Sequence, residues 1–328
     1  MTSARGRRDT LAVGQRSEGG RPLTALTPGA ETRYALEMTL RRGVAWLCLA
    51  VALSAGAVSA AGVFLRGSGA AVEVVSPRGE RYPMATDGVY AWNAQRVVAE
   101  GVGWDVFTLA VVVPALLLTA PVVARGSFRG RLLALGLLAY LFYQYLMYAV
   151  TWAFGPLLLP FVVVYAASLL AMVGVASSLA RDGVAGRFDD RYPRRGMAVL
   201  CFILAAALVA MWLARIATGL RGDLSGAMLL GQTTMVVQAL DLGLVVPLAV
   251  LTGVLCWRRH PVGLVLGSVV AVKAIAMALA ICAMVVSAWK VEGRLEVAPL
   301  AFFGAAALAA AWLGARMYRS VRPALEPG

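Results

Sequence analysis

The chain has 328 residues, of which 60% are hydrophobic and only 14% are charged. Soluble proteins carry charges on about 25% of their residues, so this composition excludes an ordinary soluble domain and favours a membrane protein. The formal net charge of +13 does not indicate nucleic-acid binding, because the basic residues lie in short segments between long apolar runs.

Apolar runs long enough to cross about 30 Å of hydrocarbon recur along the whole chain. Backbone groups in lipid must be hydrogen bonded within their own segment, so each run is expected to be a helix. The sequence therefore predicts an all-α bundle of eight spans, at residues 44–65, 104–124, 132–153, 156–180, 197–218, 233–257, 262–289 and 297–315.

The first 36 residues are rich in Arg, Gly, Ser and Thr and show no apolar periodicity, so we expect them to be disordered. Met38, followed by two arginines and the first span, is a plausible alternative start. A cleaved signal peptide at 38–61 is a second alternative. The rest divides into spans 1–4 within 37–180, a loop at 181–196, spans 5–8 within 197–320 and a tail at 321–328.

The basic residues are unevenly shared between the two sides of the predicted bundle. Of the 30 basic residues, 21 lie on the side of both termini, eight lie on the opposite side, and Lys273 lies within a span. Cytoplasmic loops carry the excess of Lys and Arg. This distribution predicts that both termini lie in the cytoplasm, in a protein that we expect to belong to a bacterial cytoplasmic membrane.

The longest predicted external segment is 66–103. Val72–Val75 and a turn at Pro77–Gly79 are expected to form a small hairpin. Asp87–Glu100 is expected to be a short amphipathic helix at the membrane interface, serving either as scaffolding or as a lid.

An internal repeat relates the two halves of the chain at an offset of 133 residues. Eight residues between Leu109 and Gly130 are identical to their counterparts, including Pro114, which matches Pro247. Four spans return the chain to its starting side, so the halves are predicted to be parallel four-helix repeats with a site between them.

Two charged residues lie inside predicted spans. Asp241 is in the sixth and Lys273 is in the seventh. Each charge costs about 2.5–3.5 kcal/mol at a bilayer centre by insertion scales, so such residues indicate a functional site. A tight turn joins the two spans, which places Asp241 and Lys273 at similar depth and predicts that they pair.

Other polar residues accompany this pair. Thr234 and Gln238 share a helix face with Asp241, and Pro247 is expected to kink the same span. In the second span Asp105 and Thr108 precede a second predicted kink at Pro114.

Asp105 lies near the end of its span, where we expect either that water solvates it or that it points toward an interior shared by the two halves. In the third span Tyr140 and Gln144 lie near mid-depth on one face. They are expected either to form hydrogen bonds inside the bundle or to line a cavity.

The sequence offers no enzyme signature and no cofactor motif. HExxH, GxSxG and GxxxxGKS/T are all missing. The four cysteines are far apart and His260 is the only histidine, so neither a disulfide framework nor a metal site is predicted.

Two stretches resemble a known family. The segment VVQALDLGLVVPLAVLTGVLCWRRHPVG, followed by Lys273, and the Tyr-rich segment RGRLLALGLLAYLFYQYLMYAV are similar to those of uncharacterised eight-span bacterial integral membrane proteins. An aspartate at the head of span 2, here Asp105, recurs in that family. The resemblance covers most of 44–315 and implies the eight-span topology, but it implies no activity.

The sequence favours a transporter-like or channel-like protein in which Asp241 and Lys273 couple the passage of a small solute or ion. Gln238, Asp105 and Gln144 are expected to help line the path. Two alternatives stay open, namely a non-catalytic scaffold or accessory subunit with a structural ion pair and, third, a membrane-embedded enzyme. The lipid bilayer is the only partner that the sequence indicates, and no oligomeric state follows from it.

Overall fold

The computed structural model describes residues 28–184 and 186–322. The chain forms two compact units, Met1–Met38 and Thr39–Gly328. Helix α1 spans Pro28–Phe64, so it includes residues 28–36, which we expected to lack structure. Residues 1–27, which carry most of that expectation, lie outside the described part. The unit from Thr39 onward contains the membrane-spanning bundle and is described below.

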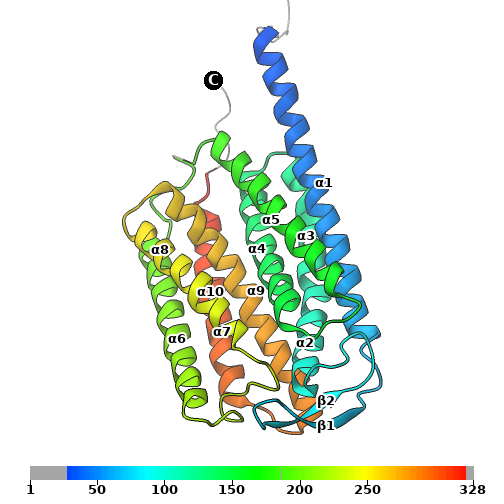
Figure 1. Ribbon diagram of the computed structural model, residues 1–328. Helices are drawn as coiled ribbons and strands as arrows, with labels where there is room; N and C mark the ends of the chain where they lie inside the picture. The colour runs from blue at the N-terminus through cyan, green and yellow to red at the C-terminus, as the bar shows by residue number, and fades with distance from the viewer. Residues whose placement is uncertain (1–27, 185, 323–328) are drawn as a thin grey trace, which may run out of the picture. The chain divides into compact units, whose positions relative to one another are not determined.

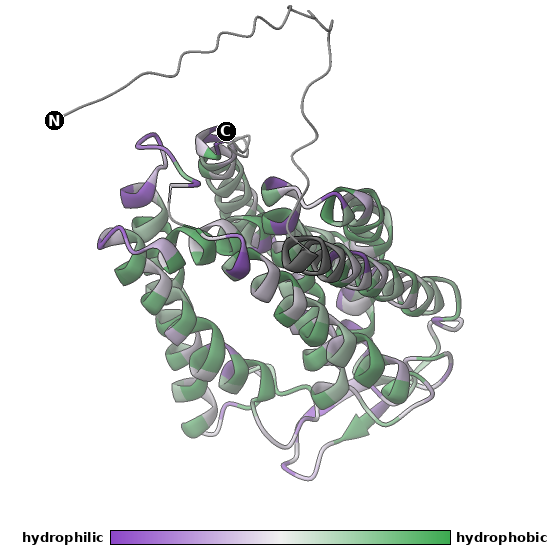
Figure 2. Ribbon diagram, turned by 90° about the horizontal axis from the view of Figure 1, so that it is seen from above, coloured by the Kyte–Doolittle hydropathy of each residue, from purple (hydrophilic) through white to green (hydrophobic). Residues whose placement is uncertain are grey.

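The described residues contain eight helical segments long and apolar enough to cross a membrane. This confirms the predicted all-α, multi-pass class. The spans are Met38–Phe64, Gln95–Ala124, Phe128–Thr151, Leu158–Arg181, Arg194–Leu220, Val236–Trp257, Pro261–Glu292 and Val297–Ser320. Figure 2 shows apolar colour along the helices and hydrophilic colour mainly at their ends and in the loops, as a bilayer requires.

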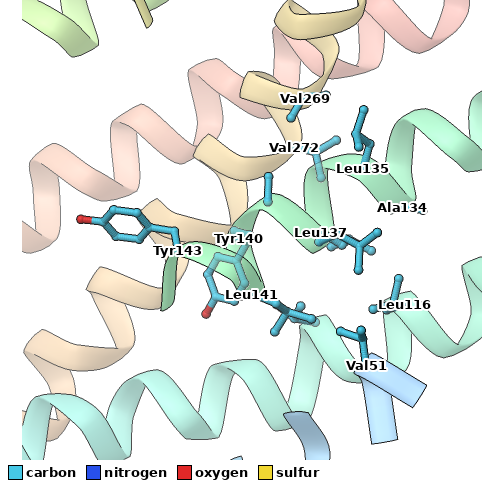
Figure 3. Close-up of a cluster of buried hydrophobic side chains, with 14 of the residues drawn as sticks. Val51, Leu116, Ala134, Leu135, Leu137, Tyr140, Leu141, Tyr143, Val269 and Val272 are labelled. Carbon is cyan, nitrogen blue, oxygen red and sulfur yellow. The ribbon is translucent and has the colours of Figure 1, made fainter. Parts of the chain in front are cut away.

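The third span, α4 (Phe128–Thr151), is the central helix of the unit. Its most apolar stretch is 72% buried within the protein, whereas the values for the other spans lie between 22% and 44%. It packs against α3 (Val113–Ala124), α5 (Leu158–Arg181) and α9 (Pro261–Glu292). Figure 3 shows its buried side chains between Val51 and Leu116 on one side and Val272 on the other.

The element boundaries reproduce the internal repeat. The second span consists of α2 (Gln95–Phe107), a wide π-helical turn η1 (Thr108–Val112) and α3. The sixth consists of α7 (Val236–Leu240), a second π-turn η2 (Asp241–Val245) and α8 (Val246–Trp257). The π-turns, the ends of α3 and α8, and the starts of α4 and α9 all differ by the same 133 positions.

The packing follows the same relationship. Helix α2 packs against α9, and its counterpart α7 packs against α4. Helices α4 and α9 are themselves neighbours, and Figure 1 shows them side by side. Helix α5 packs on α4 as α10 (Val297–Ser320) packs on α9. These exchanged contacts are those of two parallel repeats related by an axis along the membrane normal.

The loops between spans differ from the sequence prediction in one respect. The expected hairpin is present as β1 (Ala71–Val75) and β2 (Arg81–Ala85). The expected helix at Asp87–Glu100 is not, because α2 begins only at Gln95 and continues directly into the second span. Trp92 has a φ of 71°, which a right-handed helix does not allow.

The hairpin also positions the start of α7. The buried Glu80 carboxylate accepts hydrogen bonds from the backbone nitrogens of Leu230 and Gly231, each at 3.1 Å. Arg78 donates to the carbonyl of Thr233 at 3.1 Å. We call this end of the bundle the hairpin end, and the end with the α3–α4 and α8–α9 turns the turn end.

A buried arginine fixes the turn end. The Arg131 side chain is 1% exposed and donates to the carbonyls of Gly126 and Ser178. It also bonds to Asp182, which receives a second arginine, Arg41, at 2.9 Å. Partial burial acts to raise the pKa of Asp182, but Arg131 and Arg41 more than offset this effect and hold the pKa below its ordinary value.

We therefore expect Asp182→Ala to lower the free energy of unfolding by about 3 kcal/mol, because it leaves a buried guanidinium without its carboxylate. The measurement is the melting temperature of the purified protein. Asp190→Ala, at an exposed position in the same loop, is the matched control. Since the folded pKa is depressed, the wild-type advantage should be complete above about pH 4 and should decline as the pH falls below it. Equal melting temperatures for the two variants would contradict this account.

Candidate functional site

The two π-turns have the same physical cause. Pro114 and Pro247 have no backbone N–H, and a proline ring clashes with the carbonyl four residues earlier. The turn before each proline widens, so that the Val113 and Val246 nitrogens donate to the carbonyls of Thr108 and Asp241, five residues back. The sequence predicted kinks at these prolines, and the structure shows wide turns that begin at the polar residues. Such π-turns are frequent at functional sites.

Asp241 is buried and both of its carboxylate oxygens accept hydrogen bonds. Tyr143, on α4, donates its hydroxyl to Oδ1. Trp212 donates its indole nitrogen to Oδ2 at 2.8 Å, from α6 (Arg194–Leu220). The carboxylate therefore joins the central helix of the first half to two helices of the second half.

Lys273 approaches the same tyrosine from another direction. Its Nζ lies 4.4 Å from the centroid of the Tyr143 ring, a cation–π geometry. Among the described residues, no ion pair within 4.0 Å joins Lys273 to Asp241. The two charges share Tyr143, which contacts the carboxylate through its hydroxyl and the amine through its ring. The direct pairing predicted from depth alone is thus replaced by an arrangement with a tyrosine between the charges.

The other predicted polar residues form a second cluster in the first half. Thr108 is hydrogen bonded to the Tyr140 hydroxyl at 2.9 Å and donates to Gln144 at 2.8 Å. Gln144 in turn donates to Asp105 at 3.5 Å. Figure 3 shows Tyr140 and Tyr143 leaving α4 in different directions, so this one helix serves both clusters.

Asp105 is fully buried, so the expectation that water solvates it is wrong. Tyr90, in the turn before α2, donates to its Oδ2. Gly62 of α1 packs over the pair, and a Cβ at that position would lie 2.1 Å from the Asp105 carboxylate and 2.2 Å from the Tyr90 hydroxyl. The first span and the α2 entry turn therefore close over this carboxylate and exclude water from it.

The repeat relates the two clusters residue by residue. Thr108 corresponds to Asp241, and Tyr140 corresponds to Lys273. The first half thus places a neutral hydrogen-bonded pair, threonine and tyrosine, where the second half places a carboxylate and an amine. Both pairs begin at a π-turn and end on the helix that follows the turn-end loop.

The remaining predicted residues are divided. Gln238 is buried one turn before Asp241. Thr234 does not share that helix face, because α7 begins only at Val236 and Thr234 lies exposed in the preceding loop. The hairpin contacts at residues 230–233 hold this loop in a non-helical path.

The sequence analysis missed Tyr143, Trp212 and Tyr90, which supply the shortest contacts to the two buried carboxylates. The tyrosines of span 3 are visible in the sequence. What selects Tyr143 is the packing of the sixth span against α4, which brings its hydroxyl to Asp241, and no residue pattern encodes that packing. The repeat offset is a usable signal, since it aligns Tyr140 with Lys273 and directs attention to this part of α4.

The Asp241 carboxylate can take up a proton, but nothing in the arrangement indicates a metal. No group of three or more His, Cys, Asp or Glu residues with metal-binding geometry occurs within residues 28–184 and 186–322. A cavity of about 270 Å³ opens at the hairpin end, lined by the loop before α7 and the end of α4. Its lining includes Thr234 and Val236 but neither Asp241 nor Lys273.

Comparison with known proteins adds no assignment, since no family model, no curated protein and no solved structure matches the chain. The fold and the candidate site by themselves define a multi-pass membrane protein with a buried polar centre.

Exchanging the charged pair for its neutral counterpart tests the residue correspondence. We expect Asp241→Thr combined with Lys273→Tyr to fold and to melt at or above the temperature of either single variant. Two neutral groups then replace two charges, each of which costs about 2.5–3.5 kcal/mol within a membrane. The measurement is thermal unfolding of the purified variants. A double variant less stable than both single variants would show that the two halves are not equivalent here.

Proposed function

We propose that the protein is a transport protein of a bacterial cytoplasmic membrane. In this proposal Asp241 takes up and releases a proton, or pairs with a cation, as a small solute or ion passes between the two repeats. Both termini face the cytoplasm and the hairpin end faces outward. The excess of basic residues at the turn end and in the terminal segments supports this orientation. Membership of the eight-span family that the sequence resembles is part of the same proposal.

One observation carries the proposal. The first half has a π-turn and a proline, and its interhelical contact at this point is made by the neutral pair Thr108 and Tyr140. The second half has the same elements but uses Asp241 and Lys273. Charges are therefore not needed at these two positions to join the helices, although they are costly in a membrane. A charged pair at one of two equivalent positions is explained better by a role in function than by one in folding.

Tyr143 provides a means of coupling. With Asp241 ionised, the carboxylate accepts from Tyr143 and Trp212 and attracts the Lys273 amine across the tyrosine ring. A proton that binds to a carboxylate oxygen removes the negative charge and that attraction. The contact between α4 of the first half and η2 of the second half is then weakened. Protonation is thereby linked to the relative position of the two repeats.

A structural role is the second candidate, and one observation favours it. Both Asp241 oxygens already have protein donors, and the cavity at the hairpin end does not include this residue in its lining. A scaffold or accessory subunit would need no more than this, because a satisfied buried carboxylate can fix helix register.

Water access separates the two candidates without knowledge of the substrate. Gln238→Cys places a thiol at a buried position one turn from Asp241, in a background without the four native cysteines. Val250→Cys, at a position of the same span that is 41% exposed on its apolar outer surface, is the matched control. Transport requires that water reach the polar centre. A water-soluble, membrane-impermeant thiol reagent should therefore label the Gln238→Cys variant in proteoliposomes and leave the Val250→Cys variant unlabelled.

Two results of the same experiment would contradict the transport proposal. If both variants stay unlabelled from either side of the membrane while denatured protein is fully labelled, the centre is dry and the scaffold candidate replaces transport. Labelling of the Val250→Cys variant at the rate of the Gln238→Cys variant would likewise remove the evidence for a water path.

A further inference from the structure

The open cavity at the hairpin end is bordered by three separate parts of the chain. The turn before α2 contributes Trp92 and Asn93, the end of α4 contributes Thr151 and Trp152, and the loop before α7 contributes residues 230–234. Tyr82 of β2 completes the wall. Its volume of about 270 Å³ is close to the lower limit of ligand pockets, about 300 Å³.

The lining is polar but carries no charge. None of the residues around the cavity is Asp, Glu, Lys, Arg or His, although the chain has 47 residues of the first four types, 30 basic and 17 acidic. The Asn93 amide is already bonded to the backbone of Tyr90, Ala91 and Ala153. The polar residues of the lining are Tyr82, Asn93, Thr151, Gln232, Thr233 and Thr234. Such a lining suits a ligand with many neutral hydrogen-bonding groups and disfavours ions.

Aromatic rings make up much of the rest of the wall. Trp92, Trp152 and Tyr82 all border the cavity. Trp152 is held in place by Tyr90 and Tyr148, with ring centroids 4.1 and 4.9 Å away. The Trp92 side chain is 60% exposed and is therefore available to a ligand. Large rigid aromatic surfaces beside neutral polar groups fit a molecule that has apolar C–H faces and polar edges.

The backbone around the cavity is strained and firmly held. Trp92 and Leu230 adopt left-handed φ values of 71° and 52°, which are uncommon for residues other than glycine. Trp92 is fixed by a bond from its nitrogen to the Ala85 carbonyl at 2.8 Å, and Leu230 by its bond to Glu80. Strain of this kind persists where the surroundings over-determine it and is concentrated at ligand sites.

One lining residue has an unsatisfied group. The Thr151 hydroxyl oxygen is buried, and no hydrogen-bond partner for it occurs in the described part of the chain. An unpaired buried polar group costs about 1–3 kcal/mol, so this part of the cavity wall carries an uncompensated cost.

We propose that this cavity binds a neutral polyhydroxylated molecule of about the size of one sugar ring, such as a monosaccharide, a cyclitol or the glycosyl headgroup of a lipid. The aromatic side chains contact its C–H faces, and the hydroxyl and amide groups bond to its edges. This binding site does not depend on the transport role of Asp241 proposed above, because it is defined by the hairpin-end residues alone.

The test uses the full chain in nanodiscs, without glycoside detergent, whose headgroup has the proposed chemistry. Glucose, galactose and myo-inositol are titrated by calorimetry and by tryptophan fluorescence, with glucuronate and glucosamine as charged analogues. We expect saturable binding of at least one neutral probe with a Kd of about 1 mM, and weaker binding of its charged analogue. A nanodisc containing a neutral glycolipid, compared with one of phospholipid alone, distinguishes a lipid headgroup from a free sugar, since the glycolipid would compete with the probe.

Variants connect binding to the cavity. Trp92→Gly can adopt the same left-handed φ without strain, so it should fold normally and lose binding. Trp289→Gly removes a half-exposed tryptophan of α9 that does not line the cavity, and this control should bind as the wild type does. Thr151→Val should leave the melting temperature unchanged, because its hydroxyl makes no bond within the described protein.

The proposal is overturned if no neutral probe saturates, if a charged analogue binds more tightly, or if Trp92→Gly binds like the wild type. None of these outcomes depends on whether water reaches Asp241, so failure here and failure of the transport proposal are distinguishable.

Discussion

A proline nitrogen has no hydrogen to donate. The rest of this structure depends on the positions of two prolines within membrane-spanning helices. At Pro114 and Pro247 the missing donor widens one turn of a membrane helix and leaves a polar residue at the start of the wide turn. Because the chain contains this proline and its wide turn twice, at positions 133 residues apart, two equivalent polar centres face the central pair α4 and α9. The two halves then differ mainly in chemistry. One centre pairs Thr108 with Tyr140 and includes the Asp105 carboxylate, over which Gly62 and Tyr90 close, while the other places Asp241 and Lys273 on either side of Tyr143.

The central helix α4 links the two centres. Tyr140 and Gln144 contact the cluster of Thr108 and Asp105, and Tyr143, less than one turn away, contacts Asp241. A change at Asp241 is therefore felt by a helix whose other contacts hold Thr108 and Asp105. The hydrogen bonds of the buried Arg131 side chain hold the same helix in place at the turn end. Motion between the repeats, if coupled to Asp241, must pass through α4 while its Arg131 end stays fixed.

Much of the fold is predictable from sequence, and the reasons are physical. Hydrocarbon thickness sets the length of a span. Counting the apolar runs of that length therefore predicts eight spans. A repeated proline with its neighbours reveals the duplication. The predictions that are wrong concern residues whose positions are set by contacts with loops and neighbouring helices. Helical spacing places Thr234 on the face of Asp241, but contacts from the hairpin keep its segment non-helical. Position near a span end assigns Asp105 to water, but α1 and the turn carrying Tyr90 cover it. Asp241 and Lys273 are predicted to lie at similar depth in the membrane. That prediction cannot show that the Tyr143 ring lies between them.

The central claim is that Asp241 carries an exchangeable proton rather than a permanent structural charge. Infrared difference spectroscopy of the reconstituted protein between high and low pH tests it most directly, with Asp241→Asn as the reference. The account predicts a protonated carboxyl band that appears at low pH, shifts in D₂O and is missing from the variant. A spectrum in which Asp241→Asn removes no titrating band, or removes one that does not shift in D₂O, would contradict it.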